Sequence, residues 1–437
     1  MNAGALRTSY RQSLIAVPVL YLGGACVLGV LMPELDARRA VEAAPETGIG
    51  TARDILGATA TGMIAFTGFV VASVLVVVQF AAGQYSPRLV LWFRRDALTK
   101  HAIGCFLAAF AYALVALRQI EGQEAGFSPG VTVTVALAIL IGSCVLFLAL
   151  LQRVTDRLRP RTLFGAVVRE GIHAARETYP HELGDPAPLD RSWAAVDPQP
   201  VALQGRAGVV ASFDRSALVA AATRSGAVIE LVPAVGEFVD PHGELLRVHG
   251  GTVGHGSLDG LVRVADERTI EQDPAFAMRI VVDTAIRALS PAINDPTTAV
   301  HALDVLEVLV RELAGRDLEL SLARDGAGDV RLVWRSPSWE DVLDLAFGEI
   351  RHYGAGSMQI CRRLRAVLED LLASTPRQRH PAIEAQLTRL DASVHGAFPA
   401  GSPELETALA ADRTGLGLAR RSSASDEIRG DDGHEPG

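Results

Sequence analysis

The sequence predicts a membrane α-helical protein with four transmembrane helices, followed by a mixed α/β cytoplasmic region with a small β module and a helical C-terminal part. Three observations lead to this fold class. Four uncharged apolar runs occupy the first third of the 437 residues. Between about residues 201 and 270 short apolar runs alternate with glycine and proline turns, which is typical of strands. Beyond about residue 271 apolar residues recur every three or four positions, which is typical of helices.

A four-helix transmembrane domain is predicted for residues 1–160. The runs without Asp, Glu, Lys or Arg cover residues 12–32, 55–82, 101–117 and 127–152, and each can cross the ~30 Å of hydrocarbon in a bilayer. The first run follows Arg7 and Arg11, as the core of a signal peptide would. We interpret it as a retained span, because apolar residues continue to Met32 and no lipoprotein leucine stands three residues before Cys26.

Basic residues alternate between the two sides of these spans. They gather before the first span, between the second and third, and after the fourth: Arg7, Arg11, Arg88, Arg94, Arg95, Lys100, Arg153, Arg157, Arg159, Arg161 and Arg169. The two other loops hold fewer basic residues and mix them with acidic ones. Because cytoplasmic loops carry the excess of lysine and arginine, we expect an inner (plasma) membrane protein with both termini cytoplasmic.

The second span carries polar side chains that can line a pore in a homo-oligomer. Four are named as pore-lining candidates: Thr59, Thr67, Ser73 and Gln79. The alternative is packing within one subunit, since hydroxyls in such helices commonly bond their own backbone. Small residues four apart, such as Ala25 with Gly29 and Ala58 with Gly62, also let helices approach closely. The spans contain no charged residue, which disfavours a proton-coupled transporter.

A juxtamembrane motif follows the second span, with Gln84, Ser86, Pro87 and Arg88 as its distinctive residues. Ser86 suits a helix N-cap and Pro87 the first helical position. Apolar residues mixed with arginines then predict a short helix in the headgroup region of the inner leaflet. Its expected role is to anchor and orient the protein on the lipid bilayer.

Residues 161–200 are predicted to form a linker helix and a proline-rich loop, and residues 201–270 a small β-rich module. Strands are expected at Gly205–Phe213 and Ala227–Val232, with a short helix at 214–225 between them. Residues 236–248 have the pattern of the hairpin in biotinyl/lipoyl-like barrel-sandwich modules. Lys100 is the only lysine of the chain, so no carrier lysine lies in this module and we interpret it as a packing or partner-contact element.

A mainly helical cytoplasmic domain is predicted for residues 271–415. Helices are expected at about 274–289 and 296–314, then 338–353, 355–374 and 379–396, with a strand at Val330–Trp334. Asp273 and Asp295 each precede a proline and can cap the helix that follows. Residues 416–437 contain too few apolar residues to bury and are expected to be disordered.

The turn between the first two of these helices is the most distinctive stretch of the C-terminal region. Asp283 and Arg287 stand four apart and can pair on one helix face, and Asn294 suits a turn with positive φ. Local structure is a sufficient explanation for these residues. The alternative is a ligand or signalling site built from Asp283, Arg287, Asn294 and Asp295.

Two stretches resemble a known family. Gln84 to Leu89 reads Gln-Tyr-Ser-Pro-Arg-Leu and Ala288 to Ala299 reads Ala-Leu-Ser-Pro-Ala-Ile-Asn-Asp-Pro-Thr-Thr-Ala. Both are similar to signature stretches of the bacterial predicted membrane proteins catalogued as domain of unknown function 2254. The resemblance implies four spans and a cytoplasmic region, and it implies no activity. Relatives often carry Gly-Tyr-Val-Gln where this chain has Ala207 to Val210, so a function of that Gln is not expected here.

Composition excludes several chemistries. A single lysine leaves no P-loop, pyridoxal or biotinyl site in the C-terminal region, and a net charge of −9 argues against nucleic acid as a partner. The four cysteines form no paired framework. Glu170 with His173 and Glu349 with His352 have the Glu-x-x-His spacing of di-iron bundles, but chance supplies about one such pair. We therefore expect no metal and no cofactor.

The sequence thus favours an oligomeric channel-like or sensor protein with a cytoplasmic regulatory region, whose small-molecule or ion ligand is unknown. The alternative is a membrane-tethered enzyme or assembly scaffold that uses the helix-loop-helix at 283–295. Catalysis is the less favoured of the two, because no nucleophile motif such as Gly-x-Ser-x-Gly is present.

Overall fold

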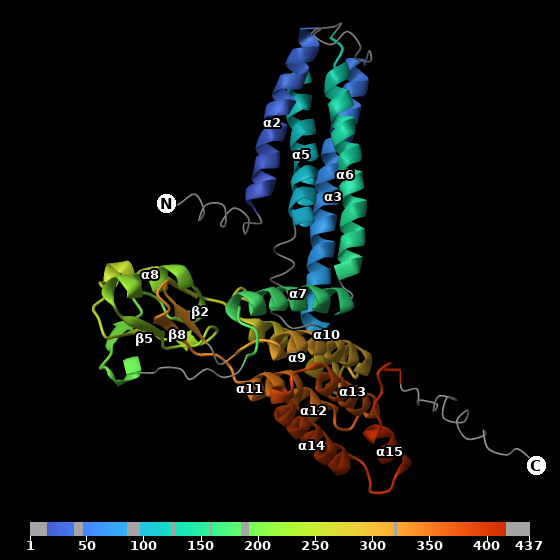
Figure 1. The fold of residues 1–437 in the computed structure, drawn as a ribbon. Coiled ribbons are helices and arrows are strands. Elements are labelled where there is room, and N and C mark those ends of the chain that lie inside the picture. Colours follow the sequence, from blue (N-terminus) through green and yellow to red (C-terminus); the bar gives the residue numbers. More distant parts are fainter. Residues whose placement is uncertain are drawn as a thin grey trace, which may run out of the picture. The chain divides into compact units, whose positions relative to one another are not determined.

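The structure, a computed structural model, describes residues 15–38, 47–84, 97–121, 123, 127–157, 160–184, 192–318 and 321–416. The chain divides into two compact units, Met1–Thr162 and Leu163–Gly437. They are called the membrane unit and the C-terminal unit below, and each is described by itself (Figure 1).

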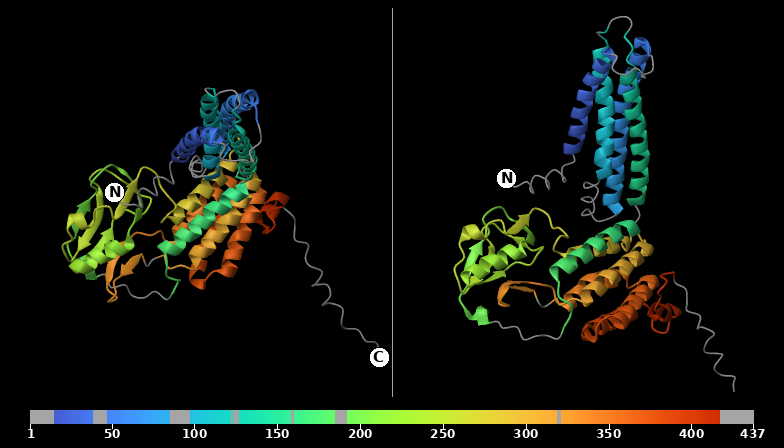
Figure 2. Two further views of the ribbon diagram at one scale, coloured as in Figure 1. Left: turned by 90° about the horizontal axis from the view of Figure 1, so that it is seen from above. Right: turned by 45° about the horizontal axis from the view of Figure 1, so that its top comes forward.

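The membrane unit is built from α2 (Ala16–Ala37), α3 (Ile49–Gln84), α5 (Ala97–Ile120) and α6 (Gly130–Arg157). Within the described residues these are the four helices long and apolar enough to cross a membrane, so the predicted four-helix membrane architecture is confirmed. They lie side by side in every view (Figures 1 and 2). α3 has 36 residues and is therefore about 54 Å long, well over the ~30 Å of a hydrocarbon core.

The interior of the membrane unit is organised around α5. Half of its apolar window is buried, against about a fifth for each of the other three helices. Small residues permit this close packing, because a Cβ on Gly29 of α2 would lie 2.9 Å from the side chain of Val115. The Ala25/Gly29 pair therefore serves packing within one subunit, as the alternative interpretation of the small-residue pairs holds.

Asp36, in the last turn of α2, caps the first turn of α6. The Asp36 carboxylate accepts from the backbone N–H of Val131 and Thr132, each at 2.9 Å, and from the Thr132 hydroxyl at 2.6 Å. Tyr112 of α5 donates to the Thr132 carbonyl at 2.8 Å. Three helices are thus joined at one end of the unit, where unpaired N–H groups would otherwise remain.

The β part of the C-terminal unit consists of two sheets. The five-stranded sheet has the order β1-β5-β3-β8-β7 and the three-stranded sheet the order β4-β2-β6. The strands are β1 (Gln199–Ala202), β2 (Gly208–Phe213), β3 (Val228–Leu231), β4 (Phe238–Val239), β5 (Glu244–His249), β6 (Val262–Ala265), β7 (Leu322–Arg324) and β8 (Val330–Trp334). One apolar core joins both sheets to α8 (Arg215–Ser225).

Two details of this part differ from the sequence prediction. Residues 236–248 do not form a hairpin, because β4 pairs with β2 whereas β5 pairs with β1 and β3. The turn at Asp240–Gly243, with His242 at φ 65°, passes the chain from one sheet to the other. The second difference is that β7 and β8, which follow the predicted β-rich segment in the chain, belong to the same sheet as β1, β3 and β5. β8 pairs in parallel with β3 and brings β7 with it, so strands far along the chain complete the five-stranded sheet.

The remaining elements of the C-terminal unit are helices. They are α7 (Pro160–Thr178), α9 (Pro274–Ala288), α10 (Pro296–Ala314), α11 (Trp339–Leu343), a π-helical segment (Asp344–Gly348), α12 (Glu349–Gly354), α13 (Met358–Ser374), α14 (His380–Ala397) and α15 (Pro403–Leu409), with short 3-10 turns at Ser192–Ala195, His255–Ser257 and Arg377–Arg379. The green α7 lies along the gold α9 and α10 in both views of Figure 2.

The predicted caps of α9 and α10 are confirmed. The Asp273 carboxylate accepts from the Phe276 N–H at 3.0 Å, and the Asp295 carboxylate from the Thr298 N–H at 3.1 Å. Each helix has proline in its first turn, where the missing N–H costs nothing. Asn294 has φ 49°, as the turn prediction requires.

Candidate functional site

The pore-lining candidates of the second span fall on two faces of α3. Thr59 and Thr67 are buried inside the membrane unit, whereas Ser73 and Gln79 are exposed on its outside. The hydroxyls of Thr59, Thr67 and Ser73 donate to their own helix, to the carbonyls of Ile55, Met63 and Phe69 at 2.6–2.8 Å. Of the four candidates, Ser73 and Gln79 therefore lie where another molecule can contact them.

The outward face of α3 carries small and polar residues in register. Thr61, Gly68, Ala72 and Gln79 are all exposed, and their spacing of seven, four and seven residues aligns them along one line of a helix with 3.6 residues per turn. No atom of the described chain would lie within 4 Å of a Cβ at Gly68. This face is called the α3 face below.

The juxtamembrane motif is described only in part. Gln84 is the last residue of α3. Ser86, Pro87 and Arg88 lie outside the described residues.

The helix-loop-helix candidates have local partners. Asp283 accepts from Arg279 Nε at 2.6 Å, and Arg279 also pairs with Glu349 of α12. Arg279 lowers the pKa of the Glu349 carboxyl, and Glu349 raises the pKa of Arg279. Near the turn, the Ser290 hydroxyl donates to the Arg287 carbonyl at 2.7 Å. These contacts connect α9 to α12 and stabilise the turn.

The remaining candidates in this stretch shape the turn itself. Both carboxylate oxygens of Asp295 accept from Thr298, one from its N–H and one from its hydroxyl. Asn294 supplies the left-handed residue of the turn. These residues thus cap α10 and form the turn that joins it to α9.

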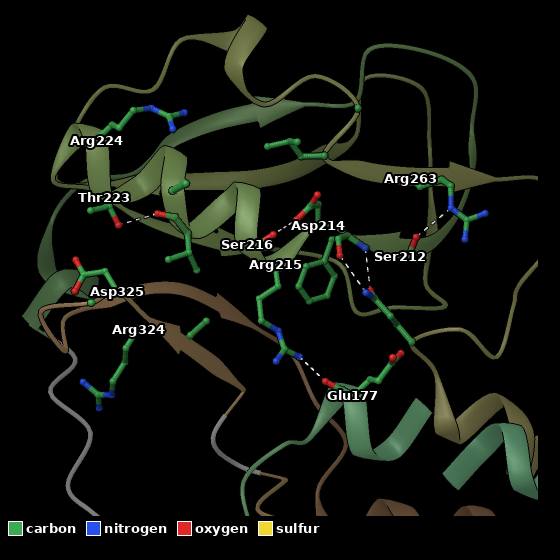
Figure 3. Close-up of a pocket in the computed structure, with 18 residues that line it drawn as sticks. Glu177, Ser212, Asp214, Arg215, Ser216, Thr223, Arg224, Arg263, Arg324 and Asp325 are labelled. Carbon is green, nitrogen blue, oxygen red and sulfur yellow. Dashed lines mark hydrogen bonds between the residues drawn. The ribbon is translucent and has the colours of Figure 1, made fainter. Parts of the chain in front are cut away.

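A groove in the C-terminal unit was not predicted from the sequence. It has a volume of about 1230 Å³ and lies between α8, the β7–β8 hairpin and the end of α7 (Figure 3). Four arginines from three elements, α8, β6 and β7, line it: Arg215, Arg224, Arg263 and Arg324. They are scattered over the chain, so no local motif marks them, and the preference for arginine over lysine is the one sequence signal that bears on them.

The arginine at the base of the groove is fixed in place. Arg215 donates to the carbonyls of Glu177 and Thr178 at the C-terminus of α7, at 2.9 and 3.2 Å. Its guanidinium lies 5.0 Å from the Trp334 ring centroid, within range of a cation–π contact. Partial burial lowers the pKa of Arg215, but an arginine remains charged at physiological pH.

No cluster of three or more His, Cys, Asp or Glu in the described part of the chain could hold a metal ion. The two Glu-x-x-His pairs have other contacts. Glu349 is bound by Arg279, and His173 lies 3.4 Å from Glu177.

Four helices long and apolar enough to cross a membrane, followed by a mixed α/β unit, define the class: a membrane protein with a large additional domain. The family described as predicted membrane protein (DUF2254) matches residues 11–370. The chain belongs to this family, which confirms the resemblance of the two signature stretches.

Two relatives come from mycobacteria. An uncharacterized protein of Mycobacterium bovis and one of Mycobacterium tuberculosis are each 28% identical to this chain over 358 residues. In each case the match covers 77% of this chain and 67% of the relative. No solved structure matches the chain significantly.

Proposed function

We propose that the protein is a homo-oligomeric, channel-like sensor of the inner (plasma) membrane. In this proposal the α3 faces of neighbouring copies meet around a common axis, and the C-terminal unit is the cytoplasmic regulatory part. The observation that carries the proposal is the α3 face itself, a line of small and polar residues that the described residues of the chain leave uncovered.

Packing forces in lipid support contact between copies at this face. Apolar side chains gain little from leaving lipid for protein, so membrane helices associate through close backbone approach and interhelical hydrogen bonds. Gly68 provides the first, because a neighbouring helix meets no side chain there. The Gln79 amide provides the second, because its donors and acceptors gain partners on another copy.

The orientation follows from charge. The basic loops before α2, between α3 and α5 and after α6 belong on the cytoplasmic side by the positive-inside rule. The C-terminal unit follows α6 and is assigned to the same compartment. The alternative enzyme or scaffold at 283–295 is not adopted, since Asp283 pairs with Arg279 within α9 and Asp295 caps α10.

The test compares two substitutions on purified protein in lipid nanodiscs. Gly68→Leu places a large side chain on the α3 face, and Gly23→Leu does the same on α2, where a Cβ also has no neighbour within 4 Å. Neither disturbs packing within the subunit, and both improve helix propensity by about 1 kcal/mol. We expect wild type and Gly23→Leu to remain oligomeric by mass photometry and Gly68→Leu to dissociate.

Ion flux into liposomes then tests the channel. We expect flux from the wild type and a clear loss with Gln79→Leu, which removes the amide and keeps the volume. A monomeric wild-type protein without flux would overturn the proposal, and so would equal dissociation by Gly68→Leu and Gly23→Leu.

A further inference from the structure

We propose that the groove between α8 and the β7–β8 hairpin is a binding site for a phosphate-bearing organic anion. This inference concerns the C-terminal unit alone. It does not depend on whether the protein is an oligomeric channel.

Three carboxylates line the groove with the four arginines, and they belong to Glu177, Asp214 and Asp325. Asp214 accepts from the Ala217 N–H at 3.0 Å and from the Ser216 hydroxyl at 2.7 Å, and these hydrogen bonds hold the pKa of Asp214 below its usual value. Asp325 pairs with Arg331 at 2.6 Å, which lowers its pKa in the same way. The lining thus has four arginines against three carboxylates, a net charge of +1, and Arg331 offsets the charge of Asp325.

The four arginines divide into two that position the walls and two that face solvent. Arg263 pairs with Glu271 and bonds the Ser212 hydroxyl, and Arg215 is tied to α7. Arg224 and Arg324 are exposed, and neither forms an ion pair with a carboxylate in the described part of the chain. Figure 3 shows Arg224 at the upper left, Arg324 at the lower left beside Asp325 and Arg263 at the right, so the two exposed arginines stand at separate places along the groove.

Arg224 and Arg324 supply what a phosphate group requires. Arg324 uses Nη1 to donate to the Gly328 carbonyl at 2.8 Å, which fixes its side chain and leaves its other N–H groups for a ligand. A guanidinium offers paired donors that match phosphate oxygens, and its charge offsets one negative charge of a phosphate group.

The floor beside these arginines suits the organic part of the ligand. Val219 and Ala220 of α8 and Ala323 of β7 line the groove. The Thr223 hydroxyl donates to the Val219 carbonyl at 2.9 Å, so the floor offers mainly aliphatic surface. The volume of about 1230 Å³ is above the ~300–1,000 Å³ of typical small-molecule sites. An anion of nucleotide size therefore fits better than a bare inorganic ion.

The phosphate can belong to a soluble metabolite or to a phospholipid headgroup, which share the recognised chemistry. The experiment uses the full-length protein in phosphatidylcholine nanodiscs, without Mg²⁺. Isothermal titration is carried out with inorganic pyrophosphate and ADP as soluble probes. Short-chain phosphatidylglycerol is the lipid probe, with short-chain phosphatidylcholine as its neutral counterpart.

We expect saturable binding of at least one phosphate probe, weakened ~10-fold by Arg224→Ala and again by Arg324→Ala, because each removes one charged donor pair. Arg224→Lys should weaken binding less than Arg224→Ala, since it keeps the charge but loses the paired donors. Arg206→Ala is the matched control, because Arg206 is exposed and lies outside the groove lining.

The pattern of binding identifies the source of the phosphate. Arginine-dependent binding of ADP or pyrophosphate supports a soluble ligand, and arginine-dependent binding of phosphatidylglycerol alone supports a lipid headgroup. The inference is overturned if no probe binds, or if Arg206→Ala weakens binding as much as Arg224→Ala and Arg324→Ala. Unchanged thermal unfolding of the variants establishes that they are folded.

Discussion

Glu312 is the residue that connects α7 to α10 through charge. It accepts from Arg176 of α7 at 3.1 and 2.9 Å and from Arg316, just beyond the end of its own helix α10, at 2.7 Å. These hydrogen bonds hold the pKa of the Glu312 carboxyl below its usual range. Because the folded state favours the ionised form, the carboxylate stabilises the fold at neutral pH, and this contribution is lost as the pH falls through the lowered pKa.

We therefore predict that Glu312→Gln lowers the free energy of unfolding by on the order of 1 kcal/mol at pH 7. The difference from wild type should shrink between about pH 5 and pH 3, as the wild-type carboxyl becomes protonated. Thermal unfolding across this range measures it. Glu384→Gln removes an exposed carboxylate of α14 and should change little, and a constant Glu312→Gln effect at every pH would refute the assignment.

The structural role of a single residue can be predicted from the sequence when its hydrogen-bond partners lie within a few positions of it. Asp273, Asp295 and Asn294 act within a few positions of themselves, so their caps and turn could be read directly. Asp36 caps a helix that begins more than ninety residues later, and no local sequence pattern predicts this cap. The groove arginines were missed for the same reason, since sheet pairing and α8 bring them together.

At the scale of elements, α7 depends on one close approach to its neighbours. A Cβ on Gly171 would lie 2.7 Å from the Cβ of Ala277 in α9 and 3.1 Å from Leu309 in α10. A Cβ on Gly165 of the same helix would meet only the flexible end of Arg169, at 3.4 Å. The two glycines thus share a helix but differ in packing.

Gly171→Ala should destabilise the C-terminal unit by about 1–3 kcal/mol, because the added methyl must push α7 away from α9 and α10. Gly165→Ala should be neutral or stabilising by up to about 1 kcal/mol, since alanine favours the helix. Urea unfolding of both variants makes the comparison. Equal effects at the two positions would show that helix propensity, and not packing, governs α7.

Helices were predicted more accurately than strands for a physical reason. The ends of α9 and α10 follow from caps and periodicity within each segment. Strand pairing is set by segments elsewhere in the chain, and β3 finds its parallel partner β8 about a hundred residues later. The Pro-x-Gly pattern at 240–243 correctly marked a turn, but it could not say that β4 and β5 belong to different sheets.

At the scale of the whole molecule, the two units differ in charge. Residues 1–162 carry 14 basic and 9 acidic residues, a net of +5, and residues 163–437 carry 27 and 41, a net of −14. The basic residues of the membrane unit gather in alternate loops, which is the pattern that directs insertion. The net negative charge of the C-terminal unit is repelled by an anionic membrane surface. We therefore expect phosphate groups to bind it at a confined basic site such as the groove.

The orientation can be tested with single cysteines in a variant from which the native cysteines are removed: Cys26, Cys105, Cys144 and Cys361. Glu34 at the end of α2 and Glu404 in α15 are both exposed, so cysteine at either position should be accessible to water. In intact spheroplasts a membrane-impermeant maleimide should label Glu34→Cys. It should label Glu404→Cys only after lysis, because the positive-inside rule assigns that helix to the cytoplasm. Labelling of Glu404→Cys before lysis would reverse the orientation and place the arginine groove outside the cell, where cytoplasmic phosphate compounds do not reach it.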